Sequence, residues 1–306
     1  MPENTYPIVT VGDDAASLIV APSAGGRLMR WIVDGHDILA WPQQPDWSDV
    51  AKIRGGDPLL FPFIGRHRVD GNDGFWRDAQ GVVRAMPTHG FARRAAFDFR
   101  VDDDGQGIVM RLRDNPATQA AYPFAFEFEV RYRLVEGGSL DAEFIVRNRA
   151  AAGAALPYYA GHHFYFALPH RARADSTLRL PPTDACRQQP NGMPGNPEPA
   201  ALHYRLNDPA LQDTFHVLRA TTASPQVTIE MPTLGRTLLL DLARPGSVPW
   251  YAVTTWSERE DSDFYCVEPW LGLPDAIHHK QGLRWLEPGQ QERAICRLSV
   301  RLGHAN

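Results

Sequence analysis

The chain has 306 residues, of which 43% are hydrophobic and 22% charged, with a formal net charge of -5. This length allows one large domain or two average ones, and the composition is that of a globular protein with a buried core. The acidic balance argues against nucleic acid and anionic membrane surfaces as partners. Three cysteines are too few, and too odd in number, for a disulfide framework.

The sequence shows neither a signal peptide nor a membrane-spanning segment. The first twenty residues lack the basic start and apolar run of a signal peptide. No stretch approaches the roughly 20 apolar residues that cross a bilayer. We therefore expect a cytoplasmic protein with no membrane partner.

Alternation of apolar and polar residues with period 2 dominates the chain and predicts strands. The clearest case covers residues 124–134, where Phe124, Phe126, Phe128 and Val130 alternate with mostly charged residues. Shorter stretches follow the same pattern at residues 140–146, 226–231, 237–242 and 294–302. Helical patterns are hard to find, and 25 glycines and 26 prolines divide the chain into short elements. The sequence predicts an all-β sandwich or barrel with few short helices.

Residues 181–199 depart from this pattern, because they contain six prolines and little apolar content. We interpret them as a long loop. Strand patterning resumes after it, so we predict a single domain over residues 1–306.

Two early segments combine glycines with ionisable side chains. The first, GGDPLLFPFIGR at residues 55–66, ends in Arg66, whose guanidinium can donate hydrogen bonds to a ligand that the glycines allow to approach closely. The alternative is a buried strand ended by a turn, with Arg66 in solvent. The second, THGFAR at residues 88–93, has a bend that can present His89 to a pocket, or simply a turn histidine.

A third segment, YYAGHHFYFAL at residues 158–168, places two histidines in aromatic surroundings. On a strand, His163 and Tyr165 share one face and His162 the other. A buried imidazole needs a hydrogen-bond partner, so at least one of them is either satisfied in the core or functional. We expect no metal, because adjacent strand histidines point apart and no Cys or His with zinc-like spacing accompanies them.

A fourth segment, FYCVEPW at residues 264–270, places Glu268 on one strand face with Cys266 and Trp270. A buried carboxylate needs a partner or acquires a raised pKa that suits proton transfer. The alternative is a strand-edge glutamate whose carboxylate lies in water.

Taken in order, these segments resemble the aldose 1-epimerase family, also called galactose mutarotase-like proteins. The family's "dG..iL" turn is similar to residues 34–39, its "GG.P.LFP..GR" segment to residues 55–66, and its "HGFAR" to residues 89–93. Its "H.YF.L" strand is matched from His163 to Leu168, and its "EPW.G..D" from Glu268 to Asp275. The resemblance extends from residues 25–27 to residues 286–289. It implies a large antiparallel β-sandwich of the galactose mutarotase-like kind.

The resemblance also implies an activity, the interconversion of the α and β anomers of a free aldohexose without metal or organic cofactor. Glu268 would be the base on the anomeric hydroxyl and His163 the acid at the ring oxygen, because the reaction needs one group of each kind. Sugar-binding residues implied in the same way are Arg66, His89, Asp213, and Trp270 or Tyr165 stacked on the pyranose ring.

Departures from the family pattern leave the sugar open. The classical galactose mutarotases carry Asn-Arg where this chain has Gly65-Arg66, and usually Asn-His-x-Tyr-Phe where it has residues 161–166.

Three other functions remain open. A hexose 6-phosphate epimerase would need cationic groups, which Arg27, Arg66, Arg68, Arg93 and Arg94 offer if they converge. A non-catalytic sugar-binding protein on the same fold is the second, although the presence of both His163 and Glu268 weighs against it. A glycosidase would normally use two facing carboxylates rather than a His–Glu pair.

Overall fold

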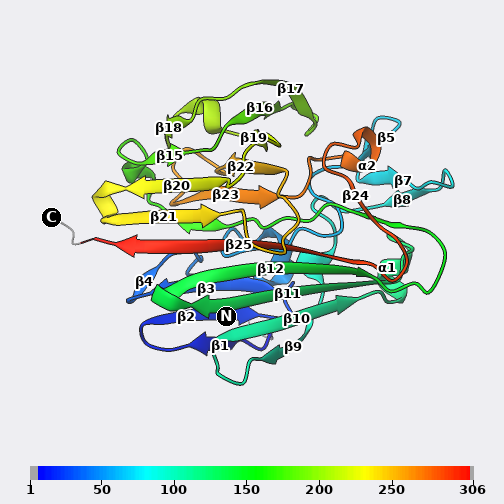
Figure 1. Cartoon of the computed structure of the whole chain (residues 1–306), viewed down its shortest axis with the longest axis horizontal. Helices are drawn as coiled ribbons and strands as arrows, with labels where there is room; N and C mark the ends of the chain where they lie inside the picture. Colours follow the sequence, from blue (N-terminus) through cyan, green and yellow to red (C-terminus); the bar gives the residue numbers. More distant parts are fainter. Residues whose placement is uncertain (1–5, 304–306) are drawn as a thin grey trace.

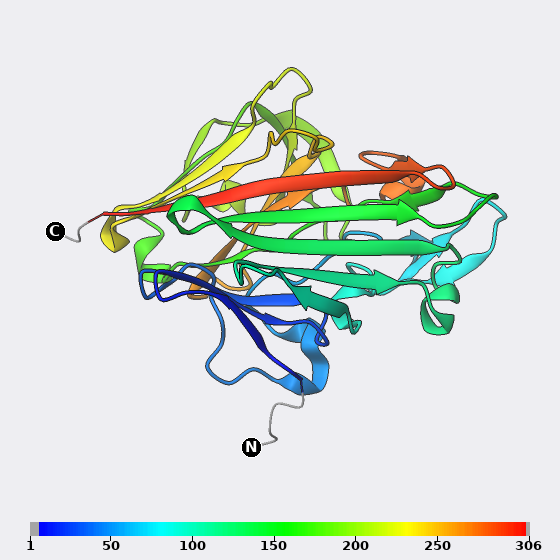
Figure 2. The same cartoon turned by 60° about the horizontal axis from the view of Figure 1, so that its bottom comes forward.

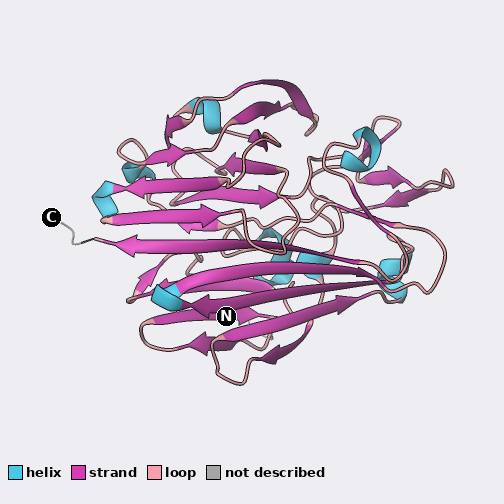
Figure 3. Ribbon diagram, in the orientation of Figure 1, coloured by secondary structure: helices cyan, strands magenta, loops and turns pink. Residues whose placement is uncertain are grey.

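The computed structural model describes residues 6–303 and is built almost entirely of antiparallel strands, as the alternation predicts (Figure 1, Figure 3). Its largest sheet has nine strands. In spatial order they are β18 (His203–Arg205), β15 (Thr177–Arg179), β20 (Gln226–Met231), β21 (Arg236–Asp241), β25 (Gln291–Leu302), β12 (Ser139–Asn148), β11 (Phe126–Val135), β10 (Gly107–Arg113) and β9 (Asp98–Val101). The neighbouring strands β25, β12, β11 and β10 run side by side in both orientations (Figure 1, Figure 2).

A second sheet has six strands and carries Glu268 and Cys266. Its order is β14 (Tyr165–Ala167), β23 (Phe264–Trp270), β22 (Ala252–Trp256), β19 (Thr214–Leu218), β16 (Thr183–Gln188) and β17 (Pro194–Pro199). Side chains from both large sheets belong to one buried apolar cluster, so the two sheets share a core.

Smaller elements complete the fold. A four-stranded sheet contains β1 (Val9–Gly12), β2 (Ala16–Ala21), β3 (Arg27–Val33) and β4 (His36–Asp37). Two-stranded pairs join β13 (Leu156–Tyr158) to β24 (Arg284–Leu286), β5 (Arg68–Val69) to β6 (Asn72–Asp73), and β7 (Phe75–Arg77) to β8 (Val83–Ala85). The helices are the short α1 (Pro116–Gln119) and α2 (Ala276–His279), with 3-10 turns at Trp47–Lys52, Ala92–Arg94, Glu136–Gly138, His170–Ala172, Pro209–Leu211 and Pro232–Leu234. Within residues 6–303, no helix combines the length and apolar content that a bilayer crossing requires.

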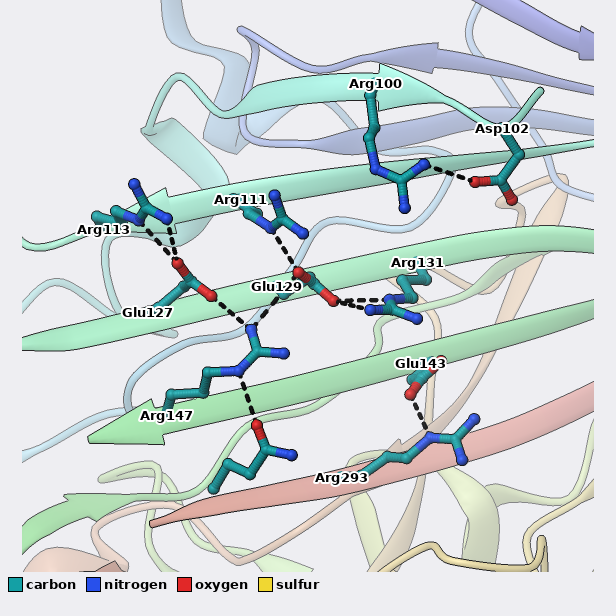
Figure 4. Close-up of polar contacts among 11 residues, drawn as sticks. Arg100, Asp102, Arg111, Arg113, Glu127, Glu129, Arg131, Glu143, Arg147 and Arg293 are labelled. Carbon is teal, nitrogen blue, oxygen red and sulfur yellow. Dashed lines mark hydrogen bonds and ion pairs between the residues drawn. The ribbon is translucent and has the colours of Figure 1, made fainter. Parts of the chain in front are cut away.

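The alternating sequence of β11 explains why the nine-stranded sheet has one apolar and one charged face. Phe126, Phe128, Val130 and Tyr132 are fully buried in the core. The intervening residues form ion pairs on the opposite face, where Arg111 contacts Glu129 at 2.5 Å (Figure 4). Related pairs join Arg113 to Glu127, Arg131 to Glu129, Arg147 to Glu127, and Arg293 to Glu143. Apart from Arg131 and Glu129, which both lie on β11, these partners lie on adjacent strands, so strand register sets the pairing.

The proline-rich segment 181–199 is not the loop that its composition suggests. It forms the hairpin of β16 and β17 at the edge of the six-stranded sheet. An edge strand tolerates proline because one side of its backbone makes no ladder hydrogen bonds, which is why three of the six prolines fit within β17. This hairpin contributes the side chain of Gln188 to a cavity on the six-stranded sheet.

Candidate active site

A polar cavity of about 290 Å³ lies on one face of the six-stranded sheet. Phe215, Thr254 and Glu268 form part of its wall and are register partners across β19, β22 and β23. The remaining lining residues come from loops and strand ends: Arg54, Gly65, Arg66, Thr88, His89, Arg93, His163, Gln188, Asp213, Trp256 and Trp270. The sheet therefore supplies a rigid wall, and loops from distant parts of the sequence supply most of the cations and imidazoles.

Glu268 is placed by β23, where the predicted strand is present. The residue is 1% exposed, although it reaches the cavity. The indole Nε1 of Trp270, two residues along the same strand face, donates a hydrogen bond of 3.1 Å to Glu268 Oε2. This bond orients the carboxylate and leaves Oε1 facing the neighbouring imidazole. The alternative of a strand-edge glutamate in water is wrong.

The prediction that the two histidines lie in a strand is wrong. They lie in the extended segment between β13 and β14. Successive side chains still point to opposite sides. The ring of His162 is fully buried, stacks on Phe144 of β12 at 4.0 Å, and its Nδ1 lies 2.6 Å from Asp57 Oδ2. The backbone N–H of His163 donates to Asp57 Oδ1 at 2.7 Å. His162 thus belongs to the core, and His163 faces the cavity.

Asp57 anchors this segment to the rest of the protein. It is fully buried, and the hydroxyl of Tyr132 on β11 donates to its Oδ2 at 2.6 Å, in addition to the two histidine contacts. A carboxylate with three such neighbours holds the backbone of His163 in one position relative to the nine-stranded sheet.

His163 and Glu268 are in direct contact, with Nδ1 and Oε1 3.3 Å apart. Strand alternation predicted the faces of the two side chains but not this distance. Tyr165 stacks on the His163 ring, with centroids 4.7 Å apart and planes 8° from parallel. Because Tyr165 is 1% exposed and does not line the cavity, the expectation that it could stack on a sugar is corrected: its ring supports His163 instead.

Burial shifts the two pKa values in directions that disfavour both charges. Desolvation, reinforced by the nearby charge of Arg93, lowers the pKa of His163 well below its usual value. Desolvation raises the pKa of Glu268 well above the usual range, against the opposing hydrogen bond from Trp270. Without substrate, these directions favour a neutral imidazole beside a protonated carboxyl group, so the pair carries one transferable proton, on the carboxyl side. Transfer of that proton across the contact produces an imidazolium and a carboxylate with no change in total charge.

Other predicted binding residues surround this pair. The ring of His89 lies 5.8 Å from that of His163 and 6.0 Å from that of Trp270. Its Nδ1 accepts a hydrogen bond of 3.2 Å from the backbone N–H of Gly65, and burial lowers its pKa well below the usual value. The neutral ring then carries its proton on Nε2, which makes that atom a hydrogen-bond donor.

Arg66 and Asp213 lie in the cavity wall with uncommitted side chains. Within residues 6–303, neither side chain makes a hydrogen bond or ion pair to the protein that meets ordinary distance limits. Arg66 is exposed, and it packs closely against Gly192 at the tip of the β16–β17 hairpin.

The five arginines considered for phosphate binding do not all converge. Arg27 is buried and donates to the carbonyls of residues 50, 53 and 55. Arg68 pairs with Asp73 and Arg94 with Asp49. Only Arg66 and Arg93 of that group line the cavity.

Sequence patterns missed several cavity residues, among them Arg54, Trp256 and Gln188. Arg54 lies over the ring of Trp256 at 5.4 Å and pairs with Glu258 at 2.8 Å. Trp256 pairs in register with Cys266, so it lies on the strand beside the EPW segment. Its place in a strand next to that motif was the only signal that could have indicated a cavity residue. Gln188 comes from the segment interpreted as a loop.

One group of residues has the donor atoms of a metal site. The ligand atoms of His163, Cys266 and Glu268 all lie within 4.8 Å of one another, and all three residues are buried.

The protein is an antiparallel β-sandwich whose cavity is lined by a carboxyl group and imidazoles and has the size of a small-ligand site. The sequence profile of the aldose 1-epimerase family matches residues 7–299. The chain belongs to the aldose 1-epimerase family, and its fold is that of the galactose mutarotase-like proteins.

Individual relatives are distant. The chain is 25% identical over 261 residues to the chromosomal protein LacX of Lactococcus lactis subsp. lactis, covering 80% of this chain and 81% of LacX. It is 27% identical over 157 residues to a putative glucose-6-phosphate 1-epimerase of Cenchrus ciliaris, covering 46% of this chain and 41% of that protein. Among solved structures it is similar to the Slr1438 protein of Synechocystis sp. PCC 6803, with a TM-score of 0.83, 24% identity and coverage of 97% and 96% of the two chains.

Proposed function

We propose that this protein is an aldose 1-epimerase that interconverts the α and β anomers of a free aldohexose. The observation that carries the proposal is the 3.3 Å contact between His163 and Glu268 in the wall of a polar cavity. Family membership supports an epimerase, and the cavity has the size of a small-ligand site.

In the proposed reaction, Glu268 as carboxylate takes the proton of the anomeric hydroxyl while His163 as imidazolium protonates the ring oxygen. The bond between C1 and the ring oxygen breaks, and C1 becomes an aldehyde. Rotation about the C1–C2 bond and reversal of the two proton transfers close the other anomer. Each positioned proton transfer is worth on the order of 10²- to 10⁴-fold in rate.

The pKa directions fit a reaction that keeps the proton count of the pair constant. Ring opening moves one proton onto Glu268 and one off His163, and ring closure reverses both transfers, so the pair holds one transferable proton throughout. The hydrogen bond from Trp270 favours the carboxylate form of Glu268. Hydroxyl groups of a bound sugar would add further donors to it.

Sugar binding in this proposal uses the cavity wall around the pair. Nε2 of His89 and the guanidinium of Arg66 donate to sugar hydroxyls, and Asp213 accepts from one. The indole of Trp270, 3% exposed, offers the aromatic surface.

Polarimetry on freshly dissolved α-D-glucose and α-D-galactose tests the proposal. Acceleration of mutarotation by the purified chain is expected for at least one sugar. Silence on both, with glucose 6-phosphate also unaffected, would contradict an epimerase and leave a non-catalytic sugar-binding protein.

A hexose 6-phosphate is the second candidate substrate, favoured by Arg66 and Arg93 in the same cavity. Burial lowers the pKa of Arg93 to about 10, which still leaves it charged at neutral pH. Two guanidinium groups suit a phosphate. If the phosphate ester is the substrate, Arg66→Ala should raise KM for glucose 6-phosphate far more than KM for glucose. Equal changes for both sugars would exclude Arg66 as a phosphate ligand.

A further inference from the structure

Cys266 approaches the acid–base pair through the register of two strands. On β23, Cys266 and Glu268 are two residues apart and point to the same side, and Cys266 pairs in register with Tyr165 of β14. His163 lies two residues before Tyr165 and also points to this side, as the stacked rings show. The sequence separates His163 from Cys266 by about a hundred residues, so no metal-ligand spacing was visible there.

The three side chains present one nitrogen, one sulfur and one oxygen donor. Three protein ligands of these kinds, with a fourth position open to a cavity, are typical of Zn²⁺ sites with an exchangeable ligand. The thiolate selects Zn²⁺ or Cd²⁺ over the hard cations Mg²⁺ and Ca²⁺.

A second observation concerns His163 itself. Its Nδ1 is buried and, within residues 6–303, has no hydrogen-bond partner of acceptable geometry, although Glu268 Oε1 lies 3.3 Å away. The residue is 8% exposed. A buried polar atom without a partner is costly, and coordination to a cation would satisfy it.

We propose that His163, Cys266 and Glu268 form a binding site for a thiophilic divalent cation, Zn²⁺ or Cd²⁺, which shuts the acid–base site when it binds. The thiol of Cys266 and the carboxyl group of Glu268 each release a proton to solvent, and the cation forms bonds to the sulfur and the oxygen with no change of oxidation state. Glu268 and the neutral His163 supply the oxygen and nitrogen.

The required rearrangement is small. Tetrahedral Zn²⁺ with bonds of roughly 2.0–2.3 Å holds its ligand atoms about 3.6 Å apart. The present separations reach up to 4.8 Å. Coordination requires side-chain movements that close this difference of about 1 Å.

Binding would occupy both proton-transfer groups at once. The inhibitory consequence therefore rests on the proposed epimerase function, whereas the binding itself does not. A chelator should restore activity, because no covalent change remains on the protein.

Titration of the full-length reduced protein with Cd²⁺ tests the binding directly, through the ultraviolet absorption of a cadmium–thiolate bond. We expect one equivalent of Cd²⁺ to produce this band. Both Cys266→Ser and Cys266→Ala should remove it. Cys296→Ala is the matched control, because Cys296 is a free, fully buried thiol on the other large sheet, and it should keep the band.

Thermal melts of the three variants identify any that fail to fold, and the serine variant keeps nearly the same volume. A band that persists in folded Cys266→Ser, or no band in the unmodified protein at millimolar Cd²⁺, would overturn the proposal.

The kinetic arm uses Zn²⁺ in the mutarotation assay. We expect inhibition that competes with sugar, and inhibition that is weaker by roughly 100-fold or more in Cys266→Ala, since even supporting residues of metal sites are worth about 10- to 100-fold in affinity. Inhibition of equal strength in that variant would refute the site. A protein that forms the Cd²⁺–thiolate band but accelerates no mutarotation would refute the proposed function and leave the metal site standing.

Discussion

Replacement of Glu268 by glutamine separates the proton chemistry of this side chain from its packing. The amide has the same shape, and its oxygen can still accept the hydrogen bond that Trp270 Nε1 now gives to Oε2 at 3.1 Å. It cannot accept a proton from the anomeric hydroxyl. We therefore expect a folded protein that binds sugar and scarcely catalyses mutarotation.

The expected loss in kcat is about 10²- to 10⁴-fold, the usual worth of one positioned general base. This corresponds to about 2.7–5.5 kcal/mol in the activation barrier. The assay is the initial rate of optical rotation change with α-D-glucose or α-D-galactose, corrected for the spontaneous rate.

The unfolding free energy of Glu268→Gln should not fall with its activity. The folded state raises the pKa of Glu268, so above the ordinary pKa of glutamate the folded state binds more protons than the unfolded state, and unfolding free energy falls as pH rises. Glutamine removes this dependence. At pH 7 the variant should be at least as stable as the parent in a thermal melt.

The matched control is Glu230→Gln, because Glu230 is an exposed glutamate on β20 of the other sheet, and it should leave the rate unchanged. A folded Glu268→Gln protein with near-parental activity would remove Glu268 as the base. A variant that does not fold would instead show that the carboxyl group has a structural role that glutamine cannot fill.

His163→Asn should lower kcat with little effect on KM, and its combination with Glu268→Gln should be scarcely worse than either alone, as kinetics of the double variant will show. The parent should keep its activity below pH 6.5, because burial lowers the pKa of His163 and delays the second protonation of the pair; an acid limb centred above that value in the rate–pH profile would contradict this. Asp57→Asn should cost about 1–3 kcal/mol of stability in denaturant titrations, since it leaves buried donors unpaired, and should also lower kcat. Glu129→Gln should destabilise the protein at pH 7 but not in strong acid. Burial opposes ionisation of Glu129, but hydrogen bonds from arginines outweigh this effect and leave its pKa lowered. The stability that the Glu129 carboxylate contributes is therefore lost as pH falls through that pKa. Melts of both proteins at several pH values check this.

Much of the architecture followed from local patterns. Strict alternation in β11 determined which side chains enter the core, because a strand has only two faces. The segment 226–231 was predicted with the bounds that β20 has. The prediction of a single domain over residues 1–306 stays a prediction.

Composition gave a wrong prediction for an edge strand, which does not need an apolar face. Residues 181–199 appeared to be a loop because prolines and polar residues dominate, yet their position at a sheet edge makes β16 and β17 possible. The family resemblance offered Tyr165, as an alternative to Trp270, for stacking on the sugar, whereas the packing shows its ring stacked on the imidazole of His163.

The sequence by itself determined the strand class and the family resemblance, and it indicated His163 and Glu268 as the candidate acid and base, because alternation and short motifs depend on neighbouring residues. Only the tertiary structure decided that Nδ1 and Oε1 lie 3.3 Å apart, that Asp57 fixes the His163 backbone, and that Cys266 joins the pair. These contacts depend on strand register and on chain segments about a hundred residues apart, and no local pattern specifies such distances.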